Sequence, residues 1–447
     1  MSVQPYSLLA LGTLIQNVCL QQETTESDAV TALEEMLRET AIYKVRVPDK
    51  LHFVWIGEVS RADLSYLSVW HRFNPDKALF LWTDKSSDYC CLFQHSLKEY
   101  SHNHPDHGSL YELQNAAFTF IYPRITSGET FNTAASHFLV MNGIPEQSDK
   151  TAHNNNTDQY QGMVTLCDIQ TLFTDELLPY RKLYYYELIL RGNLAAASDI
   201  IRLLILYRIG GVYIDLDTLP DVEKVFRATQ RVENTLGMAN HELICLAKSA
   251  AFLAWFDGNE NITASVDFYI RKITHLSEND YTKLRESVAF DIMNINIRDI
   301  PPLGEVLSYP DLMKIGAVHF LPGIFFNNFL CAAPGSRLIK IILMNIARRY
   351  AILKREDALF ASPDTTDQGR ILENTDNYRN NNDFFSDAFT LSLTGPGMIV
   401  NTLLRLVFRI MPLGSQVPPE RLAERLQDQM FGLTQKDQTL DTPMGLK

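Results

Sequence analysis

Apolar runs separated by a helical stretch predict a strand–helix–strand beginning for the main part of the chain. The run Leu51–Gly57 is closed by a glycine, and a second run, Ala78–Trp82, ends at Thr83 and Asp84. The residues between the two runs are enough for one helix. A strand, a helix and a second strand in this order form a βαβ unit. We therefore expect an α/β domain that begins near residue 49.

The α/β alternation is clearest in residues 193–220. Asn193 is a good helix cap, and the residues after it are strong helix formers with a continuous apolar face. Two glycines, Gly210 and Gly211, end this predicted helix. A short apolar strand follows and ends in Asp215 and Asp217. Because side chains two apart on a strand point to one side, we expect these carboxylates to converge.

The rest of the chain is divided by weaker patterns. Residues 1–48 contain an apolar helix-like piece, Ser7–Cys19, and an amphipathic one, Thr25–Thr40, so we expect a small helical cap there. Residues 49–447 are expected to form one domain with helical insertions at about 100–190 and 220–310. Segments rich in Asn, Asp, His or Gly are predicted loops, namely 101–108, 145–158 and 376–383.

Composition narrows the classes of function. The chain has 447 residues, 46% hydrophobic and 21% charged, which is ample for a large core. The net charge of −13 argues against general binding of nucleic acid, so a phosphorylated ligand must meet a local arginine, helix end or metal ion. None of the six cysteines forms a CxxC pair, and no apolar run is long enough for a transmembrane helix. We expect a soluble chain without a cleaved signal peptide.

Asp199 and Arg202 are the first candidates for chemistry. They stand three residues apart on the predicted helix and so project from the same side, placing an acceptor beside a fixed cation. Such a pair can hold the hydroxyl groups of a sugar. Taken alone, it is more often an ordinary salt bridge on a solvated face.

Asp215 and Asp217 are candidate metal ligands. Hard carboxylate oxygens suit Mg²⁺ or Mn²⁺, and such sites usually borrow phosphate oxygens from the substrate. A D-x-D pair alone occurs by chance in many turns, but here a helix with Asp199 and Arg202, a Gly-Gly stop and a strand precede it. Trp55 ends the first strand at the edge where α/β sheets bind ligands, and its indole can stack on a nucleobase. A tryptophan in an apolar run is otherwise usually core.

Two blocks, LHFVWIG at Leu51–Gly57 and NLAAASDIIRLLILYRIGGVYIDLDTLP at Asn193–Pro220, resemble the N-terminal glucosyltransferase domain of the large clostridial toxins. Weaker similarity continues through Phe325–Leu353 and Thr394-Gly395-Pro396, so the resemblance covers most of residues 50–400. The resemblance implies a GT-A type, Rossmann-like mixed sheet with helical insertions. It also implies a UDP-sugar donor and Mn²⁺, or Mg²⁺, as the metal.

The resemblance also implies roles for single residues. Asp199 and Arg202 would bind the transferred sugar, Asp215 the ribose and sugar, and Asp217 the metal, and we group these four as catalytic, with Asp215 and Asp217 as the metal pair. The remaining expected contacts to the donor are Trp55, which stacks on uracil, and Val54, Ser198, Tyr213 and Asn327.

The chain also departs from the toxin pattern. The toxins close the donor site with a C-terminal loop that carries a glutamate, a serine and a tryptophan, whereas this chain has no tryptophan after Trp255. Asp437 or Asp441 is a candidate for completing the metal shell from the tail. Phe326 and Asn328 flank Asn327 where the glucose-using toxins have isoleucine and glutamine, and their bulk favours glucose over N-acetylglucosamine.

The resemblance implies a retaining transferase that moves glucose from UDP-glucose to a hydroxyl of a host protein, with a Rho- or Ras-type small GTPase as the candidate acceptor. It suggests a secreted bacterial effector that acts in the host cytosol. A GT-A transferase for glycans or lipids is one alternative, although no basic membrane-binding patch supports it. A catalytically inactive scaffold that binds nucleotide sugars is another. No general base stands out in the sequence.

Overall fold

A computed structural model describes most of the chain. The residues that it describes are 44–59, 62–84, 89–146, 160, 162–239, 241–258, 262–309, 311–317, 323–360, 390–410, 423–424, 427, 434–436 and 439–440. The helices predicted within residues 7–19 and 25–40, and the loop predicted at 376–383, lie outside these residues. Within the span 1–48, β1 (Val45–Arg46) is a strand paired with β7 (Leu307–Ser308), and the helical cap itself stays a prediction.

A mixed seven-stranded sheet forms the centre of the molecule, in the order β10-β8-β9-β5-β2-β3-β4. β5, β2, β3 and β4 run parallel, β9 is antiparallel to both β5 and β8, and β10 is parallel to β8. The strands are β2 (Lys50–Trp55), β3 (Ala78–Thr83), β4 (Val164–Asp168), β5 (Gly211–Ile214), β8 (Met313–Ala317), β9 (Phe325–Ala332) and β10 (Thr434–Lys436). The predicted α/β class and the opening βαβ unit are confirmed.

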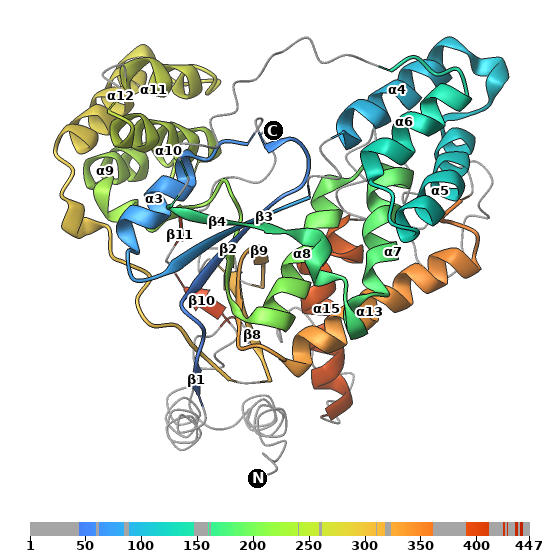
Figure 1. Cartoon of the computed structure of the whole chain (residues 1–447). Helices are drawn as coiled ribbons and strands as arrows, with labels where there is room; N and C mark the ends of the chain where they lie inside the picture. Colours follow the sequence, from blue (N-terminus) through green and yellow to red (C-terminus); the bar gives the residue numbers. More distant parts are fainter. Residues whose placement is uncertain are drawn as a thin grey trace.

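Helices lie in two groups beside the sheet, and Figure 1 shows them on opposite sides of it. One group comprises α3 (Ser65–Phe73), α9 (Arg227–Leu236), α10 (Glu242–Phe256), α11 (Ile262–Ile270) and α12 (Glu278–Met293). The other comprises α4 (Cys90–Asn103), α5 (Leu110–Thr126), α6 (Phe131–Met141), α7 (Tyr180–Tyr185), the π-helix η8 (Tyr186–Arg191), α8 (Leu194–Ile209), α13 (Arg337–Arg355) and α15 (Pro396–Ile410).

Several of these helices fall within residues 100–190 and 220–310, where the sequence predicted helical insertions, although the domain boundaries themselves stay a prediction. Two local details differ from the sequence predictions. The strand β4 also lies within 100–190. In addition, α4 continues to Asn103 and a short 3-10 turn, η4 (Pro105–His107), follows, so only part of 101–108 is irregular.

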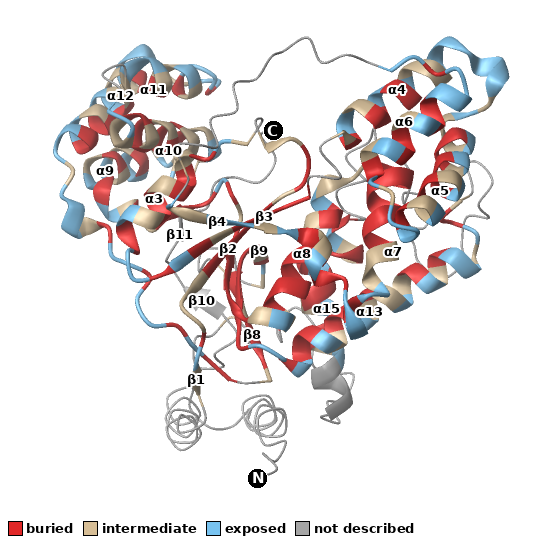
Figure 2. Cartoon of the chain, in the orientation of Figure 1, coloured by how far each residue is buried: buried red, intermediate tan, exposed pale blue. Residues whose placement is uncertain are grey.

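Alternating side chains of the central strands build a core on each face of the sheet. Figure 2 shows that the central strands consist mostly of buried residues. Leu51 and Phe53 of β2 lie in one buried cluster with Trp70 of α3. Val54 of β2 and Tyr213 of β5 lie in the other, which includes most of the buried apolar residues of α8. A strand buried on both faces needs apolar residues at nearly every position, as the two predicted strands have.

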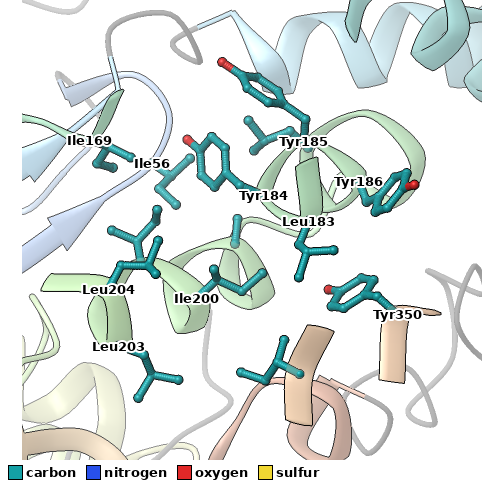
Figure 3. Close-up of a cluster of buried hydrophobic side chains, with 14 of the residues drawn as sticks. Ile56, Ile169, Leu183, Tyr184, Tyr185, Tyr186, Ile200, Leu203, Leu204 and Tyr350 are labelled. Atoms are coloured by element: carbon teal, nitrogen blue, oxygen red, sulfur yellow. The ribbon is translucent and has the colours of Figure 1, made fainter. Parts of the chain in front are cut away.

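The larger cluster fixes α8 between the sheet and the other helices of the second group. Figure 3 shows Ile200, Leu203 and Leu204 of α8 lying among Tyr184 and other aromatic and aliphatic side chains of that group. Every residue of α8 from Ile200 to Leu206 is buried. The helix therefore has little freedom to shift, and the polar residues that it carries are held with it.

The turn from α8 to β5 requires its two glycines. A Cβ on Gly210 would lie 2.6 Å from Cδ of Pro334, and one on Gly211 would lie 2.8 Å from the carbonyl oxygen of Lys50. Both residues also have positive φ angles, 68° and 113°. The predicted Gly-Gly stop is confirmed, and it brings the end of α8 directly back into the sheet.

Among the described residues, no helix combines the length and the apolar character that crossing a membrane requires.

Candidate active site

The site is built at the start of α8 and at the end of β5. Asn193 caps α8, because its side chain accepts a hydrogen bond of 2.8 Å from the backbone N–H of Ala196. The helix places Asp199 and Arg202 on the side that faces β5 and β9. β5 lies beside β2 in the sheet, and the two strands are parallel, so their carboxyl ends meet at one edge.

Arg202 lies between two carboxylates. Its Nη2 is 3.2 Å from Oδ1 of Asp199, and its Nη1 is 3.2 Å from Oδ1 of Asp215. The guanidinium also lies over the ring of Tyr213, at 4.4 Å from the centroid. Burial opposes the charge of Arg202, but Asp215, Tyr213 and Asp199 more than offset it and raise its pKa. Arg202 therefore stays a fixed cation.

Asp199 is buried with Arg202, so the pair is not a salt bridge on a solvated face. Only 5% of Asp199 and 6% of Arg202 are exposed. Asp199 accepts hydrogen bonds from Nδ2 of Asn327 at 2.8 Å and from Oγ1 of Thr394 at 2.9 Å. Burial raises the pKa of Asp199, and Arg202, Thr394 and Asn327 act in the opposite direction by stabilising the carboxylate.

A bulge in β9 brings Asn327 to this cluster. β8 pairs Ile315 with Leu330 but Gly316 with Phe326, so residues 327–329 have no partner in β8. Within this bulge the carbonyl of Asn327 accepts a hydrogen bond of 2.7 Å from Nη1 of Arg202. Next to it, the carbonyl of Asn328 accepts a hydrogen bond of 2.8 Å from the backbone N–H of Asp215. The bulge thus ties the backbone of β9 to both α8 and the carboxylate turn.

Asp215 and Asp217 lie in a turn, which corrects the geometry expected from the sequence. β5 ends at Ile214, and the N–H of Thr218 donates to the carbonyl of Asp215 at 3.0 Å, so strand alternation does not set the direction of the two side chains. Tyr213 donates its hydroxyl to Oδ1 of Asp215 at 2.5 Å. The Asp215 side chain is 25% exposed and Asp217 is exposed, so both can meet a ligand.

The donor set at this turn fits a hard divalent cation that is shared with a substrate. Among the described residues, no group of three or more His, Cys, Asp or Glu side chains could hold a metal. A metal at Asp215 and Asp217 would therefore take further oxygens from a bound diphosphate or from undescribed residues. Asp437 and Asp441 lie outside the described residues, but β11 (Thr439–Leu440) pairs with β6 (Leu219–Pro220), which follows the turn directly.

The other residues predicted to contact the nucleotide-sugar donor lie close to this cluster or at the same edge of the sheet. Trp55 ends β2, is half-buried, and donates Nε1 to the carbonyl of Glu58 at 2.9 Å. The Val54 side chain is buried in the core. Oγ of Ser198 accepts a hydrogen bond of 3.4 Å from Nη2 of Arg202. Thr394 was the residue that sequence reasoning missed: the Thr394-Gly395-Pro396 block marked its position, but nothing in the sequence gave it a partner.

Comparisons with known proteins show the family to which the chain belongs. The model of the TcdA/TcdB catalytic glycosyltransferase domain family matches residues 156–384, more than half of the 447 residues. The chain belongs to this family. The model of the glycosyltransferase sugar-binding region containing the DXD motif also matches, over residues 60–238.

Individual members of the family are distant relatives. The chain is 24% identical to Toxin A of Clostridium novyi over 361 residues, which is 75% of this chain and 16% of that protein. It is 23% identical to Toxin B of Clostridioides difficile over 345 residues, 69% of this chain and 13% of the toxin. The chain thus spans less than a fifth of the length of these relatives.

The fold itself has a solved counterpart. The crystal structure of the catalytic domain of alpha-toxin from Clostridium novyi superposes with a TM-score of 0.61 at 20% identity, covering 93% of this chain and 84% of that one. The mixed sheet with its helices is therefore of the GT-A type, as predicted.

Proposed function

We propose that this chain is a metal-dependent, retaining glycosyltransferase that moves glucose from UDP-glucose to a hydroxyl of a host protein. The observation that carries the proposal is the buried cluster in which Arg202 bridges Asp199 and Asp215. The cluster lies next to the exposed carboxylate of Asp217. It also lies at the edge of the sheet where β2 ends at Trp55. An inactive scaffold that only binds nucleotide sugars is the alternative, and donor hydrolysis separates the two.

Each part of the cluster suits one part of the donor. A guanidinium fixed between two carboxylates can bind oxygens of the sugar or diphosphate without reorganising as the bond breaks. Asp199 can accept a hydrogen bond from a hydroxyl of the sugar. The half-buried indole of Trp55 offers a stacking face for uracil. When bound at Asp215 and Asp217, Mn²⁺ or Mg²⁺ supplies a Lewis acid that offsets the charge on the leaving diphosphate.

The choice of glucose depends on Phe326. Asn328 was expected to add bulk beside Asn327, but its Oδ1 lies 3.1 Å from the position of a Cβ on Gly316, on the side of β8. The steric argument against an N-acetyl group therefore rests on the half-buried Phe326 alone.

The acceptor is proposed from the family. Relatives of this chain are toxins by name, and a hydroxyl of a small GTPase in the host cytosol is the acceptor that the family resemblance suggests. A glycan or lipid acceptor is the alternative within the same reaction class. A labelled-sugar transfer assay with host-cell lysate and with purified glycolipid separates the two.

Donor hydrolysis tests the reaction itself. Release of UDP or GDP should be measured for UDP-glucose, UDP-N-acetylglucosamine and GDP-mannose with Mn²⁺, comparing wild type with Asp215→Asn/Asp217→Asn and with the surface control Asp76→Asn. We expect metal-dependent turnover of UDP-glucose, a loss of about a hundredfold or more in the double variant, and no change in the control. A wild type that hydrolyses none of the three donors with Mn²⁺ or Mg²⁺ contradicts the proposal.

A further inference from the structure

Residues 390–394, just before α15, form hydrogen bonds with α8 and its cap at two points. Oγ1 of Thr390 accepts hydrogen bonds from Nη2 of Arg191 at 2.5 Å and from Nδ2 of Asn193, the cap of α8, at 3.0 Å. One turn later, Oγ1 of Thr394 donates to Oδ2 of Asp199 at 2.9 Å. The backbone N–H of Thr394 also donates to the carbonyl of Thr390 at 3.1 Å, so the two threonines are linked directly.

The hydrogen bonds of Asp199 leave little of its carboxylate free. An ionised carboxylate has about four lone-pair sites on its two oxygens. Asn327 and Arg202 both approach Oδ1, whereas Thr394 approaches Oδ2. The remaining acceptor site is therefore on Oδ2, beside Thr394. Gly395 keeps the neighbouring space clear, because a Cβ there would lie 3.4 Å from the same oxygen.

We propose that Thr394 is a positioning residue for the donor sugar, whose hydroxyl aims the free lone pair of Asp199 Oδ2 at a single hydroxyl of that sugar. Thr394 is 1% exposed and so acts through Asp199 and not by touching the donor. The inference rests on the proposed function, because it assigns a second residue to the same sugar contact.

The role predicts an effect on the sugar that is absent for the nucleotide. UDP lacks the hexose and should not depend on how Asp199 is aimed. Removing a hydrogen bond to a charged acceptor typically weakens the interaction by about tenfold or more. A general collapse of the site would instead weaken UDP and UDP-glucose together.

The experiment compares Thr394→Val, which keeps the shape and removes the hydroxyl, with Thr394→Ser, which keeps the hydroxyl. The matched control is Thr402→Val, since Thr402 is also buried but donates within α15 to the carbonyl of Met398 at 2.9 Å. The KM for UDP-glucose hydrolysis and the inhibition constant of UDP are measured for each purified full-length variant in the presence of Mn²⁺.

We expect Thr394→Val to raise KM for UDP-glucose about tenfold while the inhibition constant of UDP stays at its wild-type value. Thr394→Ser and Thr402→Val should resemble wild type in both quantities. A wild-type KM in Thr394→Val overturns the inference, as does an equal weakening of UDP and UDP-glucose. If the wild type itself hydrolyses no UDP-sugar, the proposed function fails instead, and this inference fails with it.

Discussion

The guanidinium of Arg202 is the point at which three elements of the fold meet. It contacts Asp199 of α8, Asp215 after β5 and the carbonyl of Asn327 in β9. Nη2 contacts Asp199, whereas Nη1 contacts both Asp215 and the carbonyl of Asn327, and a planar fork can satisfy these contacts together. The ammonium of a lysine is a compact point charge and cannot span both carboxylates.

We therefore predict that Arg202→Lys lowers kcat/KM for donor hydrolysis by about a hundredfold, although the charge is kept. The control is Arg337→Lys, because Arg337 forms a half-exposed ion pair with Asp311 at 3.3 Å and such pairs contribute little. Steady-state hydrolysis of UDP-glucose measures both variants. If Arg202→Lys has nearly full activity, the bridge is not what the reaction requires.

His52 is a buried histidine whose hydrogen bonds require the neutral ring. Its Nε2 donates to the carbonyl of Gly210 at 2.9 Å, and its Nδ1 accepts from Nε1 of Trp82 at 3.1 Å. A proton on Nδ1 would face the indole N–H. Burial lowers the pKa of His52 from 6.5 to about 4.

The unfolded chain therefore binds this proton more tightly than the folded chain, and stability falls as pH drops from about 6.5 to about 4. The shift corresponds to about 3 kcal/mol. We predict that the difference in unfolding free energy between wild type and His52→Gln shrinks by up to that amount between pH 7.5 and pH 4. Urea denaturation measures it, with the exposed His95→Gln as control. A difference that does not change with pH contradicts the prediction.

At the scale of elements, the bulge in β9 depends on a glycine in its neighbour β8. A Cβ on Gly316 would lie 2.9 Å from the carbonyl oxygen of Phe326 and 3.1 Å from Oδ1 of Asn328. Both atoms belong to the bulged segment or flank it, so any added methyl group must push the bulge away. Asn327 and the carbonyl that holds Asp215 would move with it.

Gly316→Ala should therefore raise KM for UDP-glucose by about tenfold while costing about 1–3 kcal/mol of stability. Ile315→Val is the matched control, because Ile315 precedes Gly316 on the same strand but pairs regularly with Leu330. It should cost about 1 kcal/mol and leave KM unchanged. Urea denaturation and donor hydrolysis together separate the two effects. Equal KM values in both variants would show that the bulge has no part in binding.

The contrast between these elements shows what the sequence could predict. Asn193 at the cap, the apolar run of α8 and the two glycines are local signals, and each produced the element expected from it. The bulge depends on a contact between Gly316 and a strand ten residues later, and no local pattern announces it. Thr394 reaches Asp199 across 195 positions of the chain, so its partner was equally hidden.

At the scale of the whole molecule, a buried charged network joins the π-helix to two distant parts of the chain. Nε of Arg191 lies 3.0 Å from Oε2 of Glu187, and both side chains are almost fully buried. Glu187 also accepts from the hydroxyl of Tyr350 in α13, and Arg191 donates to Thr390. The network thus connects the second group of helices to the segment that carries Thr394.

Breaking one partner of such a pair leaves a buried charge uncompensated, and we predict that Glu187→Gln lowers the unfolding free energy by about 3–5 kcal/mol. Glu187→Gln/Arg191→Leu removes both charges and should recover most of that loss. Glu176→Gln is the control, because its partner Lys340 and Glu176 itself are about half-exposed, and it should change stability little. Urea denaturation measures all three variants.

The same series shows whether the network serves the site as well as the fold. The double variant restores charge balance, but it removes the hydrogen bond from Arg191 to Oγ1 of Thr390 and keeps the one from Asn193. If Thr390 and Thr394 together hold this segment against α8, the double variant should be nearly as stable as wild type. It should nevertheless have a higher KM for UDP-glucose. A wild-type KM would mean that the hydrogen bond from Arg191 is not needed to hold the segment in place. If the double variant is as unstable as Glu187→Gln, the loss comes from packing around these side chains and not from an unpaired charge.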